Sequence, residues 1–273
     1  MNLRIKLSFL FVLASISILC SQEIKKVVSL APSITKNIYL MGANKKLVGC
    51  TNYCIIDKKD TVEVVGSVMK VNMEKLYSLK PDIVITAGLS SAKTLSMLKK
   101  LGIRYKVFES PKNFDEICEQ FLEISELLGA ENKANEIIRQ EKTKLVTLKA
   151  QVPMGQKPKI FIELGAKPLF AVIPNTFMHD YINFVGGQNI IADVNTGIIS
   201  RETVLLKNPD FIFITTMGMV GLEETATWSK YKQLNAAMHK KIFILESDIA
   251  CTACPTSFTE TVETMVRCMY GKK

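Results

Sequence analysis

Two stretches of this 273-residue chain share one pattern: residues 71–86 read VNMEKLYSLKPDIVIT, and residues 199–215 read ISRETVLLKNPDFIFIT. In each stretch a helix-capping residue type precedes a glutamate, Glu74 or Glu202, by two positions. Proline follows the glutamate seven residues later, and then comes aspartate with a run of β-branched or aromatic residues that is typical of a strand. The pattern predicts the same helix–strand unit twice, once in each half of the chain.

The two glutamates have a simple structural interpretation. A carboxylate in the first turn of a helix is stabilised by the helix dipole, so Glu74 and Glu202 need no further role. Their equivalent positions in two related halves favour a second interpretation, in which they place one negative charge on each half of an elongated protein. A two-fold symmetric membrane partner with a basic residue on each subunit fits such a pair.

The rest of the chain alternates short apolar runs with helical patterns, which predicts an α/β fold with two Rossmann-like lobes and central, mainly parallel sheets. A long charged helix over residues 130–152 connects an N-terminal lobe, residues 24–129, to a C-terminal lobe, residues 157–271; the alternative is an ordinary surface helix within one domain. The expected strands are residues 26–30, 47–50, 62–65, 82–86, 104–108, 159–164, 169–173, 210–215 and 241–246.

The first residues are typical of an export signal. A short basic start is followed by an uncharged apolar run over residues 7–19, which is shorter than the roughly 20 residues of a membrane span. Cleavage after Ser21 releases a soluble protein from a signal over residues 1–21. Cleavage before Cys20 makes that cysteine the site of lipidation and tethers the protein to a membrane; Leu19 fits that second signal imperfectly.

Composition and motifs exclude several classes of function. The chain is 48% hydrophobic with a formal charge of +9, but its basic residues are scattered and lack interleaved aromatics, so no nucleic-acid partner is expected. Phosphate-binding, dinucleotide-binding and Gly-x-Ser-x-Gly motifs are absent, which argues against an enzyme. A Cys-x-x-Cys sequence at residues 251–254 keeps thiol–disulfide exchange as a distant alternative.

Several segments together resemble a known family. Residues 27–35 read VVSLAPSIT and residues 47–54 read LVGCTNYC. With the two Glu-to-Pro-Asp segments, they resemble the periplasmic binding proteins of ABC importers for cobalamin and iron chelates (siderophores and haem). The resemblance implies the class III fold, in which two lobes are joined by one long rigid helix and the ligand binds between them. It also implies a monomer, and contacts of Glu74 and Glu202 with arginines of a dimeric inner-membrane permease.

The sequence departs from the family pattern in two places. Lys36 stands where a glutamate is common after the Pro-Ser turn, and the loop before the last helix lacks an Arg-Pro-Gly-Pro-like run, of which Pro255 remains. Both departures concern the expected ligand contacts.

Ligand-binding residues are expected in loops after the strand ends. These loops are mostly apolar, which suits a large, flat, neutral ligand such as a corrinoid, although core or loop packing is the alternative for each residue. A ferric siderophore remains open through Lys70 or Arg201, and haem through Tyr53 or Met69. The candidates are Pro32, Tyr53, Met69, Leu89, Ser90, Phe170, Met217, Met219 and Cys251.

Two features bear on metals. The chain has two histidines, His179 and His239, too few for a typical zinc or manganese site, so we expect neither a bound metal ion nor a resident cofactor beyond the cobalt or iron of the ligand itself. Cysteine pairs 50/54 and 251/254 fall in the expected cleft loops. Packing or local disulfides, and a soft-metal site between the lobes, are the alternatives for them.

Overall fold

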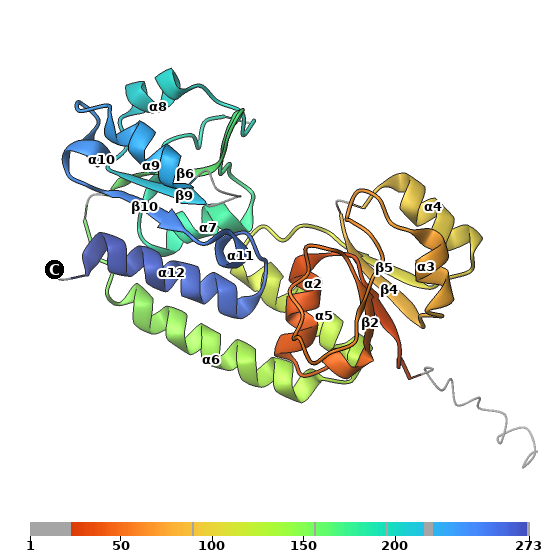
Figure 1. Ribbon diagram of the computed structural model, residues 1–273. Helices are drawn as coiled ribbons and strands as arrows, with labels where there is room; N and C mark the ends of the chain where they lie inside the picture. The colour runs from red at the N-terminus through yellow and green to blue at the C-terminus, as the bar shows by residue number, and fades with distance from the viewer. Residues whose placement is uncertain (1–22, 89, 156, 195, 216–220, 272–273) are drawn as a thin grey trace, which may run out of the picture.

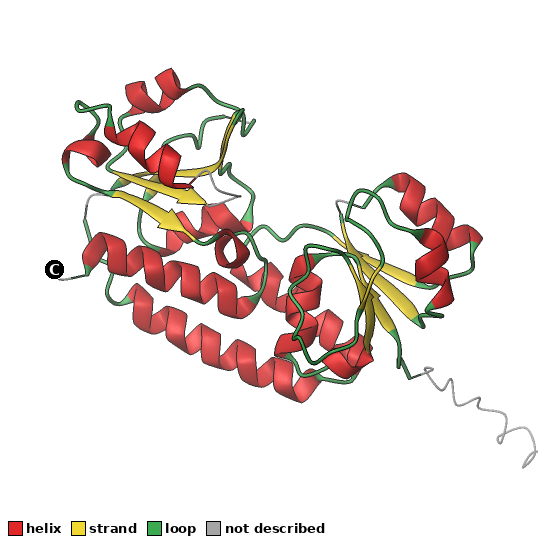
Figure 2. Cartoon of the chain, viewed as in Figure 1, coloured by secondary structure: helices red, strands yellow, loops and turns green. Residues whose placement is uncertain are grey.

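The computed structural model describes residues 23–88, 90–155, 157–194, 196–215 and 221–271, and it has two α/β lobes joined along one side by helices (Figures 1 and 2). The expected signal over residues 1–21, with Cys20, lies outside the described residues. None of the helices in the described ranges combines the length and the apolar character that a membrane crossing requires. The predicted two-lobed α/β fold is confirmed.

The N-terminal lobe contains a five-stranded sheet of order β3-β2-β1-β4-β5, in which every strand pair is parallel. The order reverses at the central strand β1, so a crevice forms at the carboxyl ends of the strands. Its elements are β1 (Val27–Ser29), α2 (Pro32–Leu40), η2 (Asn44–Lys46), β2 (Leu47–Cys50), β3 (Glu63–Val64), α3 (Met73–Ser78), β4 (Ile83–Ala87), α4 (Ala92–Lys100), β5 (Tyr105–Phe108) and α5 (Phe114–Leu128).

The C-terminal lobe contains a second sheet of order β10-β9-β6-β7, with β8 also paired to β6. β7 is antiparallel to β6, because the two residues Lys167 and Pro168 that join them are too few for a crossover. After the connecting helix α6 (Glu131–Lys149), the elements are β6 (Lys159–Ala166), β7 (Leu169–Ala171), α7 (Phe177–Phe184), β8 (Gln188–Asn189), α8 (Arg201–Lys207), β9 (Phe211–Thr215), α9 (Gly221–Ser229), α10 (Asn235–Met238), β10 (Ile242–Leu245), α11 (Ser247–Ala250) and α12 (Pro255–Tyr270).

The repeated Pro-Asp sequence has the same structural role in both lobes. Asp82 accepts hydrogen bonds at 2.8 Å from the backbone amides of Lys25 and Lys26, just before β1. Asp210 accepts one at 2.8 Å from the amide of Lys159, where β6 begins. The backbone amides of Asp82 and Asp210 also donate hydrogen bonds, to the carbonyls of Lys26 and Lys159 respectively. The aspartate thus aligns the strand it precedes with the first strand of its lobe.

Helices α5, α6 and α12 form a base that runs under both lobes, and α6 lies beside α12 along its length (Figure 1). Phe258 of α12 is the centre of an aromatic cluster, with ring centroids 4.7 Å from Tyr181, 4.9 Å from Phe114 and 5.4 Å from Phe184. Because Phe114 belongs to α5 and the other two to α7, this cluster joins the lobes through one continuous apolar core.

Candidate functional site

A cavity of about 400 Å³ lies between the lobes. The N-terminal lobe contributes the start of α2 and the loop that follows β2, and the C-terminal lobe contributes α11 and the residues just after it. Both walls lie at carboxyl ends of parallel strands, where open α/β sheets bind ligands. The lining residues are Pro32, Lys36, Tyr39, Tyr53, Ile55, Ile56, Asp57, Asp248 and Thr252.

The lining of the cavity is mainly apolar, with a few charges. Tyr53 and Ile55, which both line the cavity, expose 70% and 71% of their surface. Lys36 is the cation among the lining residues, and Asp57 and Asp248 are the acids. A ligand with a broad apolar face and few charges fits this composition best.

The loop after β2 is held in place from α2. Tyr39 donates from its hydroxyl to Asp60 Oδ2 at 2.6 Å, and Asn44 Nδ2 donates to the same oxygen at 3.0 Å. The amide of Asp57 donates to the Tyr39 oxygen at 3.3 Å. Burial and the Asp60 hydrogen bond raise the pKa of Tyr39 to about 12, so it remains a neutral donor at any physiological pH.

Cys54, between the two exposed lining residues of this loop, turns its sulfur away from the cavity. Thr35 and Thr51 place their hydroxyl oxygens 3.1 and 3.2 Å from Cys54 Sγ. Hydrogen bonding from Cys50 is the main reason that the pKa of Cys54 is lowered to about 6, whereas the same contact and burial raise the pKa of Cys50. These contacts give the loop a second anchor to the N-terminal lobe.

All six cysteines in the described ranges are free thiols. The alternative of local disulfides at 50/54 and 251/254 is therefore not what the structure shows. Cys254 is fully buried and caps α12, with its sulfur accepting from the Ser257 amide at 3.4 Å. Cys251 ends α11; burial raises the pKa of its thiol, and hydrogen bonding with Thr215 opposes that shift. No group of three or more metal-ligand residues occurs in the described part of the chain.

The structure brings Pro32 and Tyr53 into the cavity, and it places Met69, Ser90, Phe170 and Cys251 elsewhere. Met69 is 76% exposed between β3 and α3, and Ser90 contacts Thr86 after β4. Phe170 of β7 is 39% exposed and bridges to Ile198. Cys251 is close in sequence to the lining residue Thr252 but does not line the cavity itself. Leu89, Met217 and Met219 lie outside the described residues.

Sequence reasoning missed seven lining residues. Three of them follow Tyr53 in its loop, where the apolar Ile55-Ile56 pair was the available signal, and two lie on α2. Asp248 and Thr252 belong to α11 and its end, a four-residue helix that no periodicity reveals. The full set missed is Lys36, Tyr39, Ile55, Ile56, Asp57, Asp248 and Thr252.

Arg201 does not serve the cleft. Its guanidinium forms an ion pair with Glu224 and lies 4.7 Å from the ring of Trp228, both on α9. Trp228 in turn donates from Nε1 to Glu163 Oε2 at 2.6 Å. This buried network lies inside the C-terminal lobe, so Arg201 is committed to holding α8 against α9 rather than to an anionic ligand.

Glu74 and Glu202 occupy matching positions in the first turns of α3 and α8, on different lobes and far apart (Figure 1). Asn72 caps α3 by accepting from the Lys75 amide at 3.0 Å, and Ser200 caps α8 by accepting from the Thr203 amide at 3.2 Å. Both glutamates are exposed. The pKa of Glu202 is lowered by its own backbone amide and by Ser200, which keeps it ionised.

A family profile described as periplasmic binding protein matches residues 27–249. The chain belongs to the periplasmic binding protein family. It is 31% identical over 261 residues to an uncharacterized ABC transporter substrate-binding lipoprotein of Bacillus subtilis, a match that covers 91% of this chain and 81% of that protein. It is 25% identical over 251 residues to a vitamin B12-binding protein of Vibrio parahaemolyticus, covering 90% of each.

A solved structure shares this fold. The periplasmic haem-binding protein of Vibrio cholerae superposes with a TM-score of 0.80 at 17% identity, covering 90% of this chain and 98% of that one. That likeness shows the fold. This periplasmic binding protein is thus of the type that works with ABC importers and not an enzyme, and nothing in the family supports the thiol–disulfide exchange alternative.

Proposed function

We propose that this periplasmic binding protein captures a corrinoid between its lobes and delivers it to a dimeric ABC permease. The observation that carries the proposal is the interlobe cavity with its exposed Tyr53 and Ile55, which offers broad apolar contact and few charges. The similarity to a vitamin B12-binding protein over 90% of both chains supports the same ligand class. The cavity is small for a whole corrinoid, so part of the ligand would extend out of it.

A second candidate is an anionic iron chelate, either haem or a ferric siderophore. Lys36 favours it, because a lysine in an otherwise apolar cavity can pair with a ligand carboxylate or catecholate. Tyr53 is an oxygen donor of the kind that can ligate haem iron.

Equilibrium titration of the purified mature protein with cyanocobalamin, haemin and ferric enterobactin distinguishes these ligands. We expect saturable binding of cyanocobalamin at a 1:1 ratio, with no chemical change in the ligand. Preferential binding of haemin or the siderophore would replace the first proposal by the second. A protein that binds none of the three ligands would refute both proposals. The buried Trp228 does not contact the cavity, so calorimetry is a better readout than its fluorescence.

Docking through Glu74 and Glu202 is the second part of the proposal. Exposed carboxylates on both lobes suit arginines on two permease subunits, because such pairs are directional and charge-assisted. Glu74→Ala and Glu202→Ala should leave ligand affinity intact and weaken permease binding. If either change abolished ligand binding in a folded protein, the docking assignment would be wrong.

We also propose export through a signal over residues 1–21, with Cys20 as the candidate lipidation site and a monomeric mature protein. The named lipoprotein among its relatives supports lipidation. Mass spectrometry of the mature N-terminus in the native host tests this directly, because a lipidated protein begins with an acylated Cys20 and a soluble one begins after Ser21.

A further inference from the structure

Each proposed docking helix exposes a large apolar side chain on the same face as its glutamate. On α3, Tyr77 follows Glu74 by three residues and is 55% exposed. On α8, Leu206 follows Glu202 by four residues and is 87% exposed. Residues three and four apart are neighbours on a helix surface, so in each case the carboxylate and the apolar group form one patch.

Leu206 also borders a pocket of about 350 Å³ on the C-terminal lobe. The pocket lies between α8 and the chain from β8 to residue 193, and Lys159 closes one side of it. Its lining residues are Lys159, Gln188, Asn189, Ile190, Ala192, Asp193, Leu206 and Lys207.

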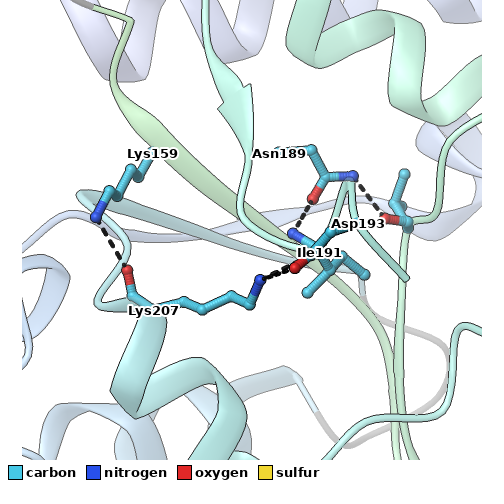
Figure 3. Close-up of polar contacts among 6 residues, drawn as sticks. Lys159, Asn189, Ile191, Asp193 and Lys207 are labelled. Carbon is cyan, nitrogen blue, oxygen red and sulfur yellow. Dashed lines mark hydrogen bonds and ion pairs between the residues drawn. The ribbon is translucent and has the colours of Figure 1, made fainter.

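Several polar groups of this pocket already have partners within the protein. Lys207 Nζ lies 2.7 Å from both carboxylate oxygens of Asp193, and Lys159 Nζ donates to the carbonyl of Lys207 at 3.4 Å. Asn189 donates to the carbonyl of Val172 at 2.9 Å and accepts from the Ile191 amide at 3.1 Å (Figure 3). Because these polar groups have partners within the protein, the apolar contact that the pocket offers an incoming side chain comes from Ile190, Ala192 and Leu206.

We propose that Tyr77 and Leu206 are apolar anchors for the permease, and that the pocket beside Leu206 receives an apolar side chain of the permease. This inference rests on the docking role proposed above for Glu74 and Glu202. The occupant is the permease because the anchors share their helix faces with the two glutamates, one patch on each lobe, which matches a partner with two-fold symmetry. Interfaces of this kind combine a buried apolar centre with charged groups that orient the encounter.

The test measures binding of the ligand-free protein to its own importer, purified from the host that encodes both and held in nanodiscs. Tyr77→Ser and Leu206→Ser should each weaken binding by roughly tenfold or more, as the loss of one buried apolar side chain does. Ala192→Phe, which fills the pocket from an exposed position, should weaken it similarly. Val146→Ser on α6, a site 72% exposed and outside both patches, is the matched control and should change binding less than about twofold.

The salt dependence of importer binding distinguishes the contribution of the apolar anchors from that of the glutamates. The loss caused by Glu202→Gln should shrink at high salt, whereas the loss caused by Leu206→Ser should persist, because screening acts on charges and not on apolar contact. Circular dichroism of each variant checks that it is folded.

The outcomes distinguish the two proposals. If Tyr77→Ser, Leu206→Ser and Ala192→Phe all bind the importer as the wild type does while Glu74→Ala and Glu202→Ala bind weakly, the anchors are refuted and docking through the glutamates stands. If none of these variants changes binding, both proposals fail.

Discussion

Glu163 lies on the central strand β6 of the C-terminal lobe with 1% of its surface exposed. Burial raises the pKa of its carboxyl to about 7, and the nearby Glu224 acts in the same direction. The hydrogen bond from Trp228 and the charge of Arg201 oppose the shift without cancelling it. The protonated form of Glu163 is therefore favoured in the folded protein up to near-neutral pH.

This environment makes stability depend on pH. A carboxyl whose pKa is raised by folding stabilises the native state below its ordinary pKa, near 4.5, and that contribution is lost as pH rises through about 7. Glu163→Gln keeps an acceptor for Trp228 and a donor for Glu224 without a charge. We expect the variant to exceed the wild type at pH 8 by up to about 3 kcal/mol in free energy of unfolding, and to match it near pH 4.5.

Urea denaturation at pH 4.5, 6 and 8 measures this difference. Glu126→Gln, at an exposed position of α5, is the control and should leave the pH profile of the wild type unchanged. An equal effect of Glu163→Gln at all three pH values would contradict the expected role of the carboxyl proton.

Lys36 decides between neutral and anionic ligands. Lys36→Ala should reduce affinity for haemin or a ferric catecholate by about tenfold or more, since a hydrogen bond to a charged group contributes roughly 1.5–3 kcal/mol. Affinity for cyanocobalamin should change less than about threefold. Calorimetry with each ligand checks this, and the exposed Lys45→Ala serves as the charge-matched control.

At this scale the sequence predicted two of the nine residues that line the cavity and none of the side-chain partners of Arg201 and Cys54. Pro32 and Tyr53 were identified because residues after parallel strands reach the cleft. The role of Arg201 was not foreseen, because its partner Glu224 lies 23 residues away and meets it through the packing of α9 on α8. The hydrogen bonds to the Cys54 sulfur likewise depend on Thr35, which only the fold brings near.

At the scale of elements, the loop after β2 depends on one tyrosine. Tyr39→Phe removes the hydrogen bonds to Asp60 and to the Asp57 amide while keeping the ring. We expect about 1 kcal/mol of lost stability and faster amide hydrogen exchange over residues 51–62. Exchange elsewhere, for example in α12, should not change, and a uniform increase over the whole chain would contradict a local role.

The predicted strands were found close to their expected places because each is a short β-branched run bounded by turn residues. Helices α9 and α10 were not predicted: α9 mixes small and polar residues, and α10 has four residues, so neither shows a clear apolar face. The predicted bounds of the N-terminal lobe (24–129), the connecting helix (130–152) and the C-terminal lobe (157–271) stay a prediction. α12 packs on α5 as well as on α6 and α7, so the base is shared by both lobes.

At the scale of the whole molecule, Phe258 connects the lobes. Phe258→Ala removes the ring that contacts Phe114, Tyr181 and Phe184, and we expect the free energy of unfolding to fall by about 3–5 kcal/mol. Because the apolar core is continuous across the lobes, unfolding should remain a single transition in the wild type. Thermal and urea denaturation check both points, with the exposed Val146→Ala expected within about 0.5 kcal/mol of the wild type.

The hydrogen bonds from the amides of Lys25 and Lys26 to Asp82 have a consequence for a protein lipidated at Cys20. Four residues, 21–24, then separate the acylated Cys20 from Lys25, whose backbone is fixed to the N-terminal sheet, and the five Cα-to-Cα steps between them span at most about 18 Å. The protein would remain within a thin layer above the bilayer instead of diffusing through the whole compartment. Its effective concentration at the permease would rise accordingly, so a weak docking contact would suffice for frequent delivery.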